Sequence, residues 1–420
     1  MSKLTLLVGA SGVGKTQILR ALMALKQIAG GSSINGINWK IQFNTLSNQH
    51  YIWEGEFENK GIDIFIDIDD DEDDNKKNKP RIIYEKLFLD DELVIDRNED
   101  KILFLGNPTI KLSQQQSIIH LLKEEEKINP AYNAIRKLNF ADHSNSVNAV
   151  QGFHFSFLNA KNLYKKYNTI EKIQESELET PLKLFFVQKT DKKVFALIKQ
   201  RFADIFPQIE DIKIAPLETK EKEMPDLLKD YPFIQIKEKG VKNWISQNRI
   251  SSGMFRTLMQ LSELYLCAEG TVFLIDEFEN SLGINCINEI TNDILASKRK
   301  LQFVLTSHHP YIIDAIGYNN WKLVTRNAGV IKTHNIDKFN IGKSKHSAFM
   351  QLIQLDEYRP GKINTANLRP IELFESSNDF LKSTTLSLTD TNEVATDILF
   401  QINFLNKYVL NYKDHFYSKS

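Results

Sequence analysis

The stretch that decides the fold is Leu4-Thr5-Leu6-Leu7-Val8-Gly9-Ala10-Ser11-Gly12-Val13-Gly14-Lys15-Thr16. Its first five residues predict a short buried strand, and the apolar spacing of residues 17–28 predicts a helix after the glycines. The part from Gly9 to Thr16 fits the pattern G-x-x-x-x-G-K-[ST] at every position. An ordinary glycine turn is the alternative, but it does not account for the flanking strand and helix. The stretch therefore predicts a loop that binds the phosphates of a nucleotide.

Each residue type in this loop has a chemical reason. Backbone N–H groups of a glycine-rich loop can surround phosphate oxygens, an ammonium group adds positive charge, and a hydroxyl can bind Mg²⁺. We expect Lys15 to contact the terminal phosphates and Thr16 to bind Mg²⁺. The residues expected to hold the nucleotide here are Gly9, Ala10, Ser11, Gly12, Val13, Gly14, Lys15 and Thr16.

A second motif follows the apolar run Val272-Phe273-Leu274-Ile275, which predicts a buried strand that ends in Asp276 and Glu277. Ligands of parallel α/β sheets bind at the carboxyl ends of the strands. We expect Asp276 to hold Mg²⁺ and Glu277 to orient and polarise an attacking water. Because surface turns often begin with two acids, this motif is weak alone. Together with the glycine loop it indicates nucleotide hydrolysis.

Two further segments flank this strand. Small residues at the start of an apolar-faced helix can offer N–H groups to a phosphate, although alone they are typical of a helix cap. A later strand ends in Thr306-Ser307-His308-His309-Pro310, where a histidine can hydrogen-bond a γ-phosphate or the water. We favour His308, because His309 precedes a proline and can serve the turn; a solvated loop histidine is the alternative. The helix-start residues are Ser251, Ser252, Gly253 and Met254.

The composition narrows the setting of the protein. The 420 residues carry a formal net charge of −1 and are 42% hydrophobic, so a large core is possible and no general affinity for polyanions is indicated. The two cysteines, Cys267 and Cys286, form no C-x-x-C pair, which argues against a metal or redox motif. No stretch resembles a secretory signal or a membrane span, so we expect a cytoplasmic protein without membrane partners.

The order of these segments resembles that of ABC-type ATPases, especially the branch that contains SMC, RecF and RecN proteins. The resemblance covers residues 1–30 and 250–325. Residues 250–254 stand at the position of the family's Leu-Ser-Gly-Gly-Gln/Glu signature, with Ser252 in place of the first glycine. Residues 280–283 match the D-loop but lack its aspartate. The family's Q-loop opens the helical subdomain, so Gln114, Gln115 and Gln116 are candidates, with Gln116 taken as the metal ligand.

More narrowly, residues 275–282 and 306–310 resemble stand-alone ATPases of bacterial anti-phage systems, such as those of Septu and PARIS and the ATPase half of OLD nucleases. OLD proteins add a Toprim nuclease after the switch histidine, whereas the residues that follow here show no acidic constellation. The resemblance implies ATP and Mg²⁺ as cofactors, a homo-oligomer built from ATP-sandwich dimers, and a separate effector protein.

The predicted fold is α/β, an ABC-type ATPase head with a mixed nucleotide-binding sheet, an antiparallel β-subdomain and a helical subdomain. We expect a single domain over residues 1–420. Within the last part, residues 394–412 predict an apolar-rich helix that packs on the chain's own sheet or contacts a partner. The expected parts are a glycine-loop unit (1–36), the β-subdomain (37–108), a helical insertion (109–210), the core with the signature, acidic strand and switch histidine (211–330), and a C-terminal extension (331–420).

The predicted function is ATP binding and hydrolysis by a sensor or regulator that controls a separate effector in anti-phage defence. One alternative is a DNA-repair ATPase similar to RecF or SMC; the short helical insertion argues against long SMC arms, and the net charge gives no support for nucleic acid. The other alternative is a nucleotide-bound scaffold without hydrolysis. The presence of every catalytic residue type argues against it.

Overall fold

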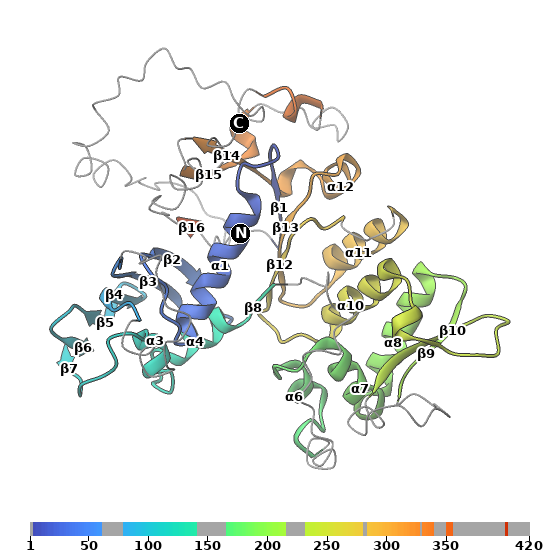
Figure 1. The fold of residues 1–420 in the computed structure, drawn as a ribbon, viewed down its shortest axis with the longest axis horizontal. Helices are drawn as coiled ribbons and strands as arrows, with labels where there is room; N and C mark the ends of the chain where they lie inside the picture. The colour runs from blue at the N-terminus through green and yellow to red at the C-terminus, as the bar shows by residue number, and fades with distance from the viewer. Residues whose placement is uncertain are drawn as a thin grey trace, which may run out of the picture.

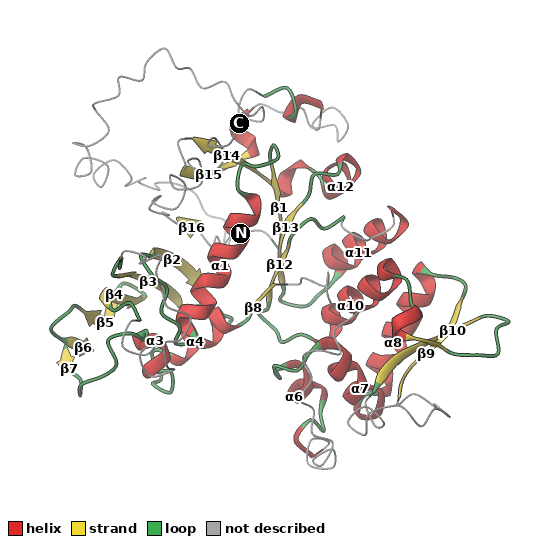
Figure 2. Ribbon diagram, in the orientation of Figure 1, coloured by secondary structure: helices red, strands yellow, loops and turns green. Residues whose placement is uncertain are grey.

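The computed structural model describes residues 3–60, 79–140, 165–215, 232–279, 284–327, 330–339, 350–355 and 400–401. Within these residues, a six-stranded sheet stands in the middle of the molecule (Figure 1). An antiparallel sheet and the long helix α1 (Lys15–Ala29) lie to one side of it, and a lobe of helices lies to the other (Figure 2). The predicted α/β fold with a mixed sheet, an antiparallel sheet and a helical part is therefore confirmed.

The central sheet is parallel except at one edge, where β14 and β15 are antiparallel. Side chains alternate between its faces, as the pleat of a strand requires. In β1, Leu4, Leu6 and Val8 pack on one face, whereas Leu7 packs on the other. In spatial order the strands are β15 (Val330–Asn335), β14 (Trp321–Asn327), β1 (Leu4–Val8), β13 (Gln302–Thr306), β12 (Val272–Ile275) and β8 (Leu138–Phe140).

The two faces of the sheet are covered by different helices. Leu19, Leu22 and Leu25 of α1 recur at the spacing of one helix face and pack with Leu7. The opposite face carries apolar side chains from three later helices, which pack with Leu4. These helices are α10 (Ser252–Leu266), α11 (Ile284–Ala296) and α12 (Pro310–Ile316). The helix after the glycine loop and the helix that begins at the signature therefore lie on opposite faces of one sheet.

The antiparallel sheet packs beside α1 on the same face. Its interior contains a fully buried carboxylate, Glu85, which accepts a hydrogen bond from Trp53 Nε1 at 3.0 Å and lies 3.7 Å from Arg97. Arg97 also donates to the carbonyls of Ser113 and Gln116, which fixes the loop before α3 (Ile118–Leu121). The strands are β16 (Phe400–Gln401), β2 (Asn38–Asn44), β3 (His50–Phe57), β4 (Ile82–Leu89), β5 (Glu92–Arg97), β6 (Ile102–Phe104) and β7 (Asn107–Pro108).

Two expectations about the elements need correction. Residues 109–210 were expected to form a helical insertion, but the structure contains the core strand β8 within them, so the chain returns to the central sheet between two sets of helices. The expected helix over residues 394–412 is wrong at Phe400 and Gln401, which form strand β16 beside β2, and the rest of this range lies outside the described residues. The helices before β8 are α3 (Ile118–Leu121) and α4 (Asn129–Arg136), and those after it are α6 (Ile170–Gln174), α7 (Thr180–Thr190) and α8 (Lys192–Ile205).

The helical lobe also includes a small antiparallel sheet, which packs with α7 and α8 into the core that covers α10. Among the described residues, none of the helices has the length and apolar character that a membrane span needs. The strands of this sheet are β9 (Ile209–Ala215), β10 (Phe233–Glu238) and β11 (Ile245–Ser246). Short 3₁₀ turns occur at η2 (Gln247–Arg249), η3 (Tyr318–Asn320) and η4 (Ile336–Phe339).

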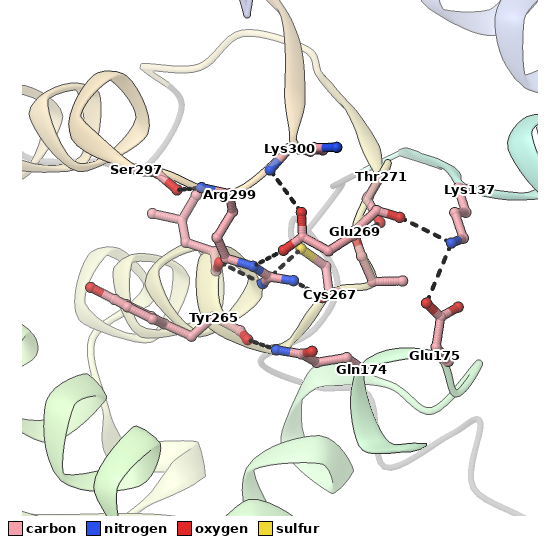
Figure 3. Close-up of polar contacts among 12 residues, drawn as sticks. Lys137, Gln174, Glu175, Tyr265, Cys267, Glu269, Thr271, Ser297, Arg299 and Lys300 are labelled. Carbon is pink, nitrogen blue, oxygen red and sulfur yellow. Dashed lines mark hydrogen bonds and ion pairs between the residues drawn. The ribbon is translucent and has the colours of Figure 1, made fainter. Parts of the chain in front are cut away.

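A polar network holds the carboxyl end of α10 against the starts of the core strands (Figure 3). Arg299 donates to the carbonyls of Leu264 at 2.9 Å and Cys267 at 2.7 Å, and to Glu269 Oε1 at 2.7 Å. Gln174 donates to the carbonyl of Tyr265 at 2.7 Å. Because the last carbonyls of a helix lack partners within it, these contacts complete the end of α10 and fix its exit toward β12.

Candidate functional site

The backbone of the glycine loop requires glycine at two positions. Gly14 has φ 99° and is the N-cap of α1, a left-handed conformation that is unfavourable for residues with a Cβ. At Gly9, a Cβ would lie 2.6 Å from the carbonyl oxygen of Val324 in β14. The neighbouring strand therefore approaches the loop closely, and the loop can keep its shape only with these glycines.

The first turn of α1 is free to receive an anion. Its N-cap gives no side-chain hydrogen bond, and the turn contains no acidic residue. The first N–H groups of a helix have no partner within it, and the helix dipole favours negative charge there. By contrast, the hydroxyl of Ser251 accepts a hydrogen bond from the Met254 N–H at 3.3 Å, so α10 is capped by its own side chain.

Lys15 is folded back onto its own loop. The ammonium donates to the carbonyls of Gly9 at 2.8 Å and Ala10 at 2.9 Å, and only 5% of the residue is exposed. Burial lowers the pKa of Lys15 to about 8, although the nearby carboxylates of Asp276, Glu279 and Glu277 favour its charged form. The Lys15 ammonium is thus held at the N-terminal end of α1 and is poorly solvated. It can therefore exchange its hydrogen bonds to these carbonyls for hydrogen bonds to phosphate oxygens.

Thr306 joins the ends of β12 and β13. Its hydroxyl donates to Asp276 Oδ1 at 2.5 Å and accepts from the Glu277 N–H at 2.8 Å. Its carbonyl accepts from the Phe278 N–H at 3.0 Å. Glu277 itself has φ 46°, an unfavourable conformation for a residue with a side chain, and such strain is common where function fixes a backbone. The turn after β12 is therefore fixed to the neighbouring strand by one threonine.

His308 stands next to Lys15. Its Nδ1 lies 3.5 Å from Lys15 Nζ, and its backbone N–H donates to Glu279 Oε1 at 2.8 Å. Burial, and then the Lys15 charge, lower the pKa of His308, while Glu279, Glu277 and Asp276 oppose this change. The imidazole is therefore neutral near pH 7. Because an ammonium can only donate, Nδ1 must accept, and the ring proton resides on Nε2.

These residues meet because β1, β13 and β12 are adjacent parallel strands that point the same way. The structure thus brings together Lys15, Asp276, Glu277 and His308, as the sequence predicts. His309 donates its N–H to Ser307 Oγ at 3.0 Å within the turn. The expected D-loop position, residues 280–283, lies outside the described residues.

Gln116 does not join this group. Its Nε2 lies 3.5 Å from the carbonyl of Gly31, just beyond the carboxyl end of α1, whereas Thr16 is in the first turn. A helix rises about 1.5 Å per residue, so the two ends of α1 are roughly 20 Å apart. Gln114 and Gln115 share this location, since their carbonyls accept from Ile82 and Ser33. The expectation that Gln116 binds the metal is therefore not supported by its position.

The predicted Mg²⁺ ligands that remain are Thr16 and Asp276. Within the described part of the chain, no group of three or more His, Cys, Asp or Glu side chains is arranged to hold a metal ion. One hydroxyl and one carboxylate suit Mg²⁺ when phosphate oxygens and waters complete its shell. These residues therefore fit a magnesium ion that arrives with a nucleotide, and they do not suit a permanent metal site.

Two residues at the site were not assigned by the sequence analysis, namely Thr306 and Glu279. Thr306 is the last residue of a buried strand, and only 1% of it is exposed. A hydroxyl at the carboxyl end of a parallel strand is a usable signal, but it does not reveal the partner. Glu279 gives no such signal, because its contact depends on the tight turn at Glu277.

A glycine loop, an acidic pair and a histidine at the ends of three adjacent parallel strands define a P-loop nucleotide-binding protein of the ATPase type. Residues 4–314 match the family described as "AAA domain, putative AbiEii toxin, Type IV TA system". The match extends over most of the chain, and the chain belongs to this family. No curated protein matches the sequence.

Several solved structures are similar to the chain at low sequence identity. An SMC head bound to the C-terminal winged-helix domain of ScpA is 13% identical, with a TM-score of 0.40 over 80% of this chain and 92% of that one. An Smc head domain from Pyrococcus furiosus is 12% identical, with a TM-score of 0.41 over 80% and 92% of the two chains. The SMC head domain from Thermotoga maritima is 12% identical, with a TM-score of 0.34 over 80% and 90%.

Proposed function

We propose that the chain binds Mg-ATP at the glycine loop and hydrolyses it. The observation that carries this proposal is the meeting of Lys15, His308 and the Thr306-bound Asp276 at three adjacent strand ends. Lys15 leaves the carbonyls of Gly9 and Ala10 and contacts the terminal phosphates. The uncapped first turn of α1 receives phosphate oxygens.

The remaining side chains have distinct roles in the reaction. Thr16 and Asp276 would hold Mg²⁺, which would neutralise phosphate charge. Glu277 is exposed, so its carboxylate can accept a hydrogen bond from a water and orient it toward the γ-phosphate. His308 donates from Nε2 to the γ-phosphate, and this donor is available because Nδ1 faces Lys15.

The assembly is proposed to be a homo-oligomer built from ATP-sandwich dimers. Support comes from the position of α10, which lies on the face of the sheet opposite α1. In this arrangement the start of α10 is presented to a second copy, whose glycine loop holds the ATP. Ser251, Ser252, Gly253 and Met254 are then the residues that contact the γ-phosphate across the interface.

The biological role is proposed to be that of a sensor or regulator that controls a separate effector in anti-phage defence. The family description names a putative toxin of a type IV toxin–antitoxin system, and the sensor role and the separate effector are proposed from the resemblance of residues 275–282 and 306–310 to stand-alone defence ATPases. A RecF-like or SMC-like repair ATPase would instead be expected to show DNA-stimulated turnover. A nucleotide-bound scaffold would be expected to bind ATP without any turnover.

The test is ATP turnover by the purified protein and by Glu277→Gln, which keeps the shape of the side chain but removes its charge. We expect hydrolysis to fall by roughly two orders of magnitude or more, with ATP binding retained. Lys15→Ala is expected to lose ATP binding itself. The matched control is Glu99→Gln, an exposed carboxylate between β5 and β6. Turnover in Glu277→Gln equal to that of the parent would show that Glu277 is structural.

A further inference from the structure

We propose that Glu279 is a positioning residue that holds the backbone of His308, so that the imidazole faces Lys15 and the terminal phosphate. The proposal rests on the function proposed above. The geometry that carries it is the 2.8 Å hydrogen bond from the His308 N–H to Glu279 Oε1, together with the 3.5 Å separation between His308 Nδ1 and Lys15 Nζ.

Glu279 reaches His308 because the turn after β12 reverses direction. The left-handed conformation of Glu277 bends the chain, and the Thr306 carbonyl accepts from the N–H of Phe278, whose side chain is buried. Glu279 comes next and is thereby directed back toward the end of β13. Beyond the β12–β13 pairing, the turn after β12 is thus joined to the end of β13 through the Thr306 hydroxyl, the Thr306 carbonyl and Glu279.

The bonding of Glu279 differs from that of a carboxylate that only stabilises the fold. Glu85 uses both of its oxygens, with Ser117 and Trp53 at Oε1 and the Ile118 N–H at Oε2. Among the described residues, which exclude 280–283, Glu279 Oε2 is buried and has no hydrogen-bond partner. Within the described residues, the hydrogen bond of Glu279 goes to His308. A buried carboxylate oxygen without a donor is unfavourable for stability, so the residue serves the histidine loop more than the fold.

The contact also orders the loop after β13, in which Ser307 is buried and His308 lies at the surface. The His308 ring is partly shielded from solvent, and its Nδ1 approaches Lys15 Nζ at 3.5 Å. Fixing the backbone N–H restricts the direction of the Cα–Cβ bond and therefore the region that the imidazole can reach. The same loop is held on its other side by the hydrogen bond from His309 N–H to Ser307.

This arrangement predicts which property of Glu279 matters. The required feature is an acceptor for the His308 N–H, which a glutamine side chain also provides, while alanine provides none. Glu279→Ala should therefore lower kcat by roughly tenfold or more and leave KM for ATP within about twofold, because the glycine loop is unchanged. Glu279→Gln should recover most of kcat. A residue with a purely structural role would lower the melting temperature without this split between kcat and KM.

The experiment compares both variants with a matched pair elsewhere in the chain. Asp90 Oδ1 accepts from the backbone N–H of another histidine, His50, at 3.0 Å in the antiparallel sheet. Asp90→Ala removes this acceptor and Asp90→Asn keeps one, away from the site, and turnover should be unaffected. Because Asp90 has φ 46°, the alanine variant also strains the backbone, so stability is measured alongside turnover. Full kcat in Glu279→Ala, or an equal loss in Glu279→Gln, would overturn the proposal.

Hydrogen exchange provides a second measurement that does not need turnover. The His308 amide should exchange faster in Glu279→Ala than in the parent, and at nearly the parent rate in Glu279→Gln. If the parent protein shows no ATP hydrolysis, the proposed function fails, while the exchange rates still decide whether Glu279 holds His308. Unchanged exchange in Glu279→Ala would overturn the positioning role even in an active enzyme.

Discussion

The hydroxyl of Thr306, at the end of β13, donates to Asp276 Oδ1 at 2.5 Å, just after the end of the neighbouring strand β12. The same oxygen accepts the N–H of Glu277 at 2.8 Å. One side chain therefore sets the orientation of the carboxylate proposed to hold Mg²⁺ and of the backbone that carries the proposed water-orienting residue. While this contact is present, the Asp276 carboxylate and the Glu277 backbone are held in place, whereas the Glu277 side chain is exposed.

Thr306→Val is expected to disturb the positions of Asp276 and Glu277 while leaving nucleotide binding nearly unchanged. Valine keeps the β-branched shape in the buried strand but has no hydroxyl, so Asp276 loses a donor and the Glu277 N–H loses its acceptor. We expect kcat to fall by roughly tenfold and the Mg²⁺ requirement to rise, with little change in nucleotide affinity. The control is Thr271→Val, because Thr271 is also buried but bonds the Ala268 carbonyl at the opposite end of β12. Equal kinetics of the two variants would contradict this role.

Proton uptake should accompany ATP binding at alkaline pH. The pKa of Lys15 is about 8 without nucleotide because burial disfavours its charge, and bound phosphates should restore it toward 10.5. Between these values, the free protein has lost a proton that the complex retains. At pH 8 we expect an uptake of about half a proton per site from Lys15, and almost none at pH 6.5. Affinity should fall as the pH rises above 8.

Calorimetry in buffers of different ionisation enthalpy measures this uptake directly. The titration at pH 6.5 is the internal control, since Lys15 is protonated there in both states. A heat of binding at pH 8 that does not vary with the buffer would show that Lys15 stays charged in the free protein. In that case its contacts with Gly9 and Ala10 would be those of a stable ammonium.

Arg299 is expected to be important for stability and unimportant for nucleotide binding. It bonds two carbonyls at the end of α10 and the Glu269 carboxylate (Figure 3). It precedes β13, whereas the site lies after the carboxyl end of that strand. Arg299→Met keeps the apolar stem but leaves these acceptors unpaired, so we expect a loss of about 2–4 kcal/mol in unfolding free energy. Denaturant unfolding would measure it. Lys298→Met, at an exposed neighbouring position, should change stability by less than about 0.5 kcal/mol.

The parts of the site that follow from local pattern were predictable. The glycine loop, the apolar run before Asp276 and the histidine at a later strand end each have a short sequence signature, and parallel strands bring their ends together. Gln116 was misplaced because its position depends on Arg97, which holds the loop of residues 113–116 at the far end of α1. No local pattern reveals that contact between a strand and a later loop.

Other features could not be predicted because the residues that form them carry no clear local pattern. Strand β8 has three residues, too few to show a period within a region of helices. The contact of Glu279 with His308 depends on the left-handed backbone of Glu277, a conformation that the sequence Asp-Glu-Phe-Glu does not indicate. Ser251 shows that a local pattern can be read correctly. The sequence allows it to be a helix cap, and in the structure its hydroxyl accepts a hydrogen bond from the Met254 N–H.

The last prediction concerns the start of α10 and separates its capping role from contact with a second subunit. Ser251 caps the Met254 N–H, so a substitution that removes the cap would destabilise the helix by about 1 kcal/mol and confuse the result. Aspartate and asparagine both cap helices well. Ser251→Asp adds a negative charge, which favours the helix dipole but would repel a γ-phosphate presented by another copy. Ser251→Asn is the uncharged control.

We expect both variants to retain the fold and to bind ATP as monomers, because the glycine loop is unchanged. Only Ser251→Asp should lose ATP-dependent association and roughly tenfold or more of the turnover. Mixing it with Lys15→Ala gives heterodimers in which one site carries both changes and the other carries neither, so partial recovery of turnover is expected. Full activity of Ser251→Asp alone, with hydrolysis at dilutions where only monomer is present, would refute the composite site, because each chain would then complete its own.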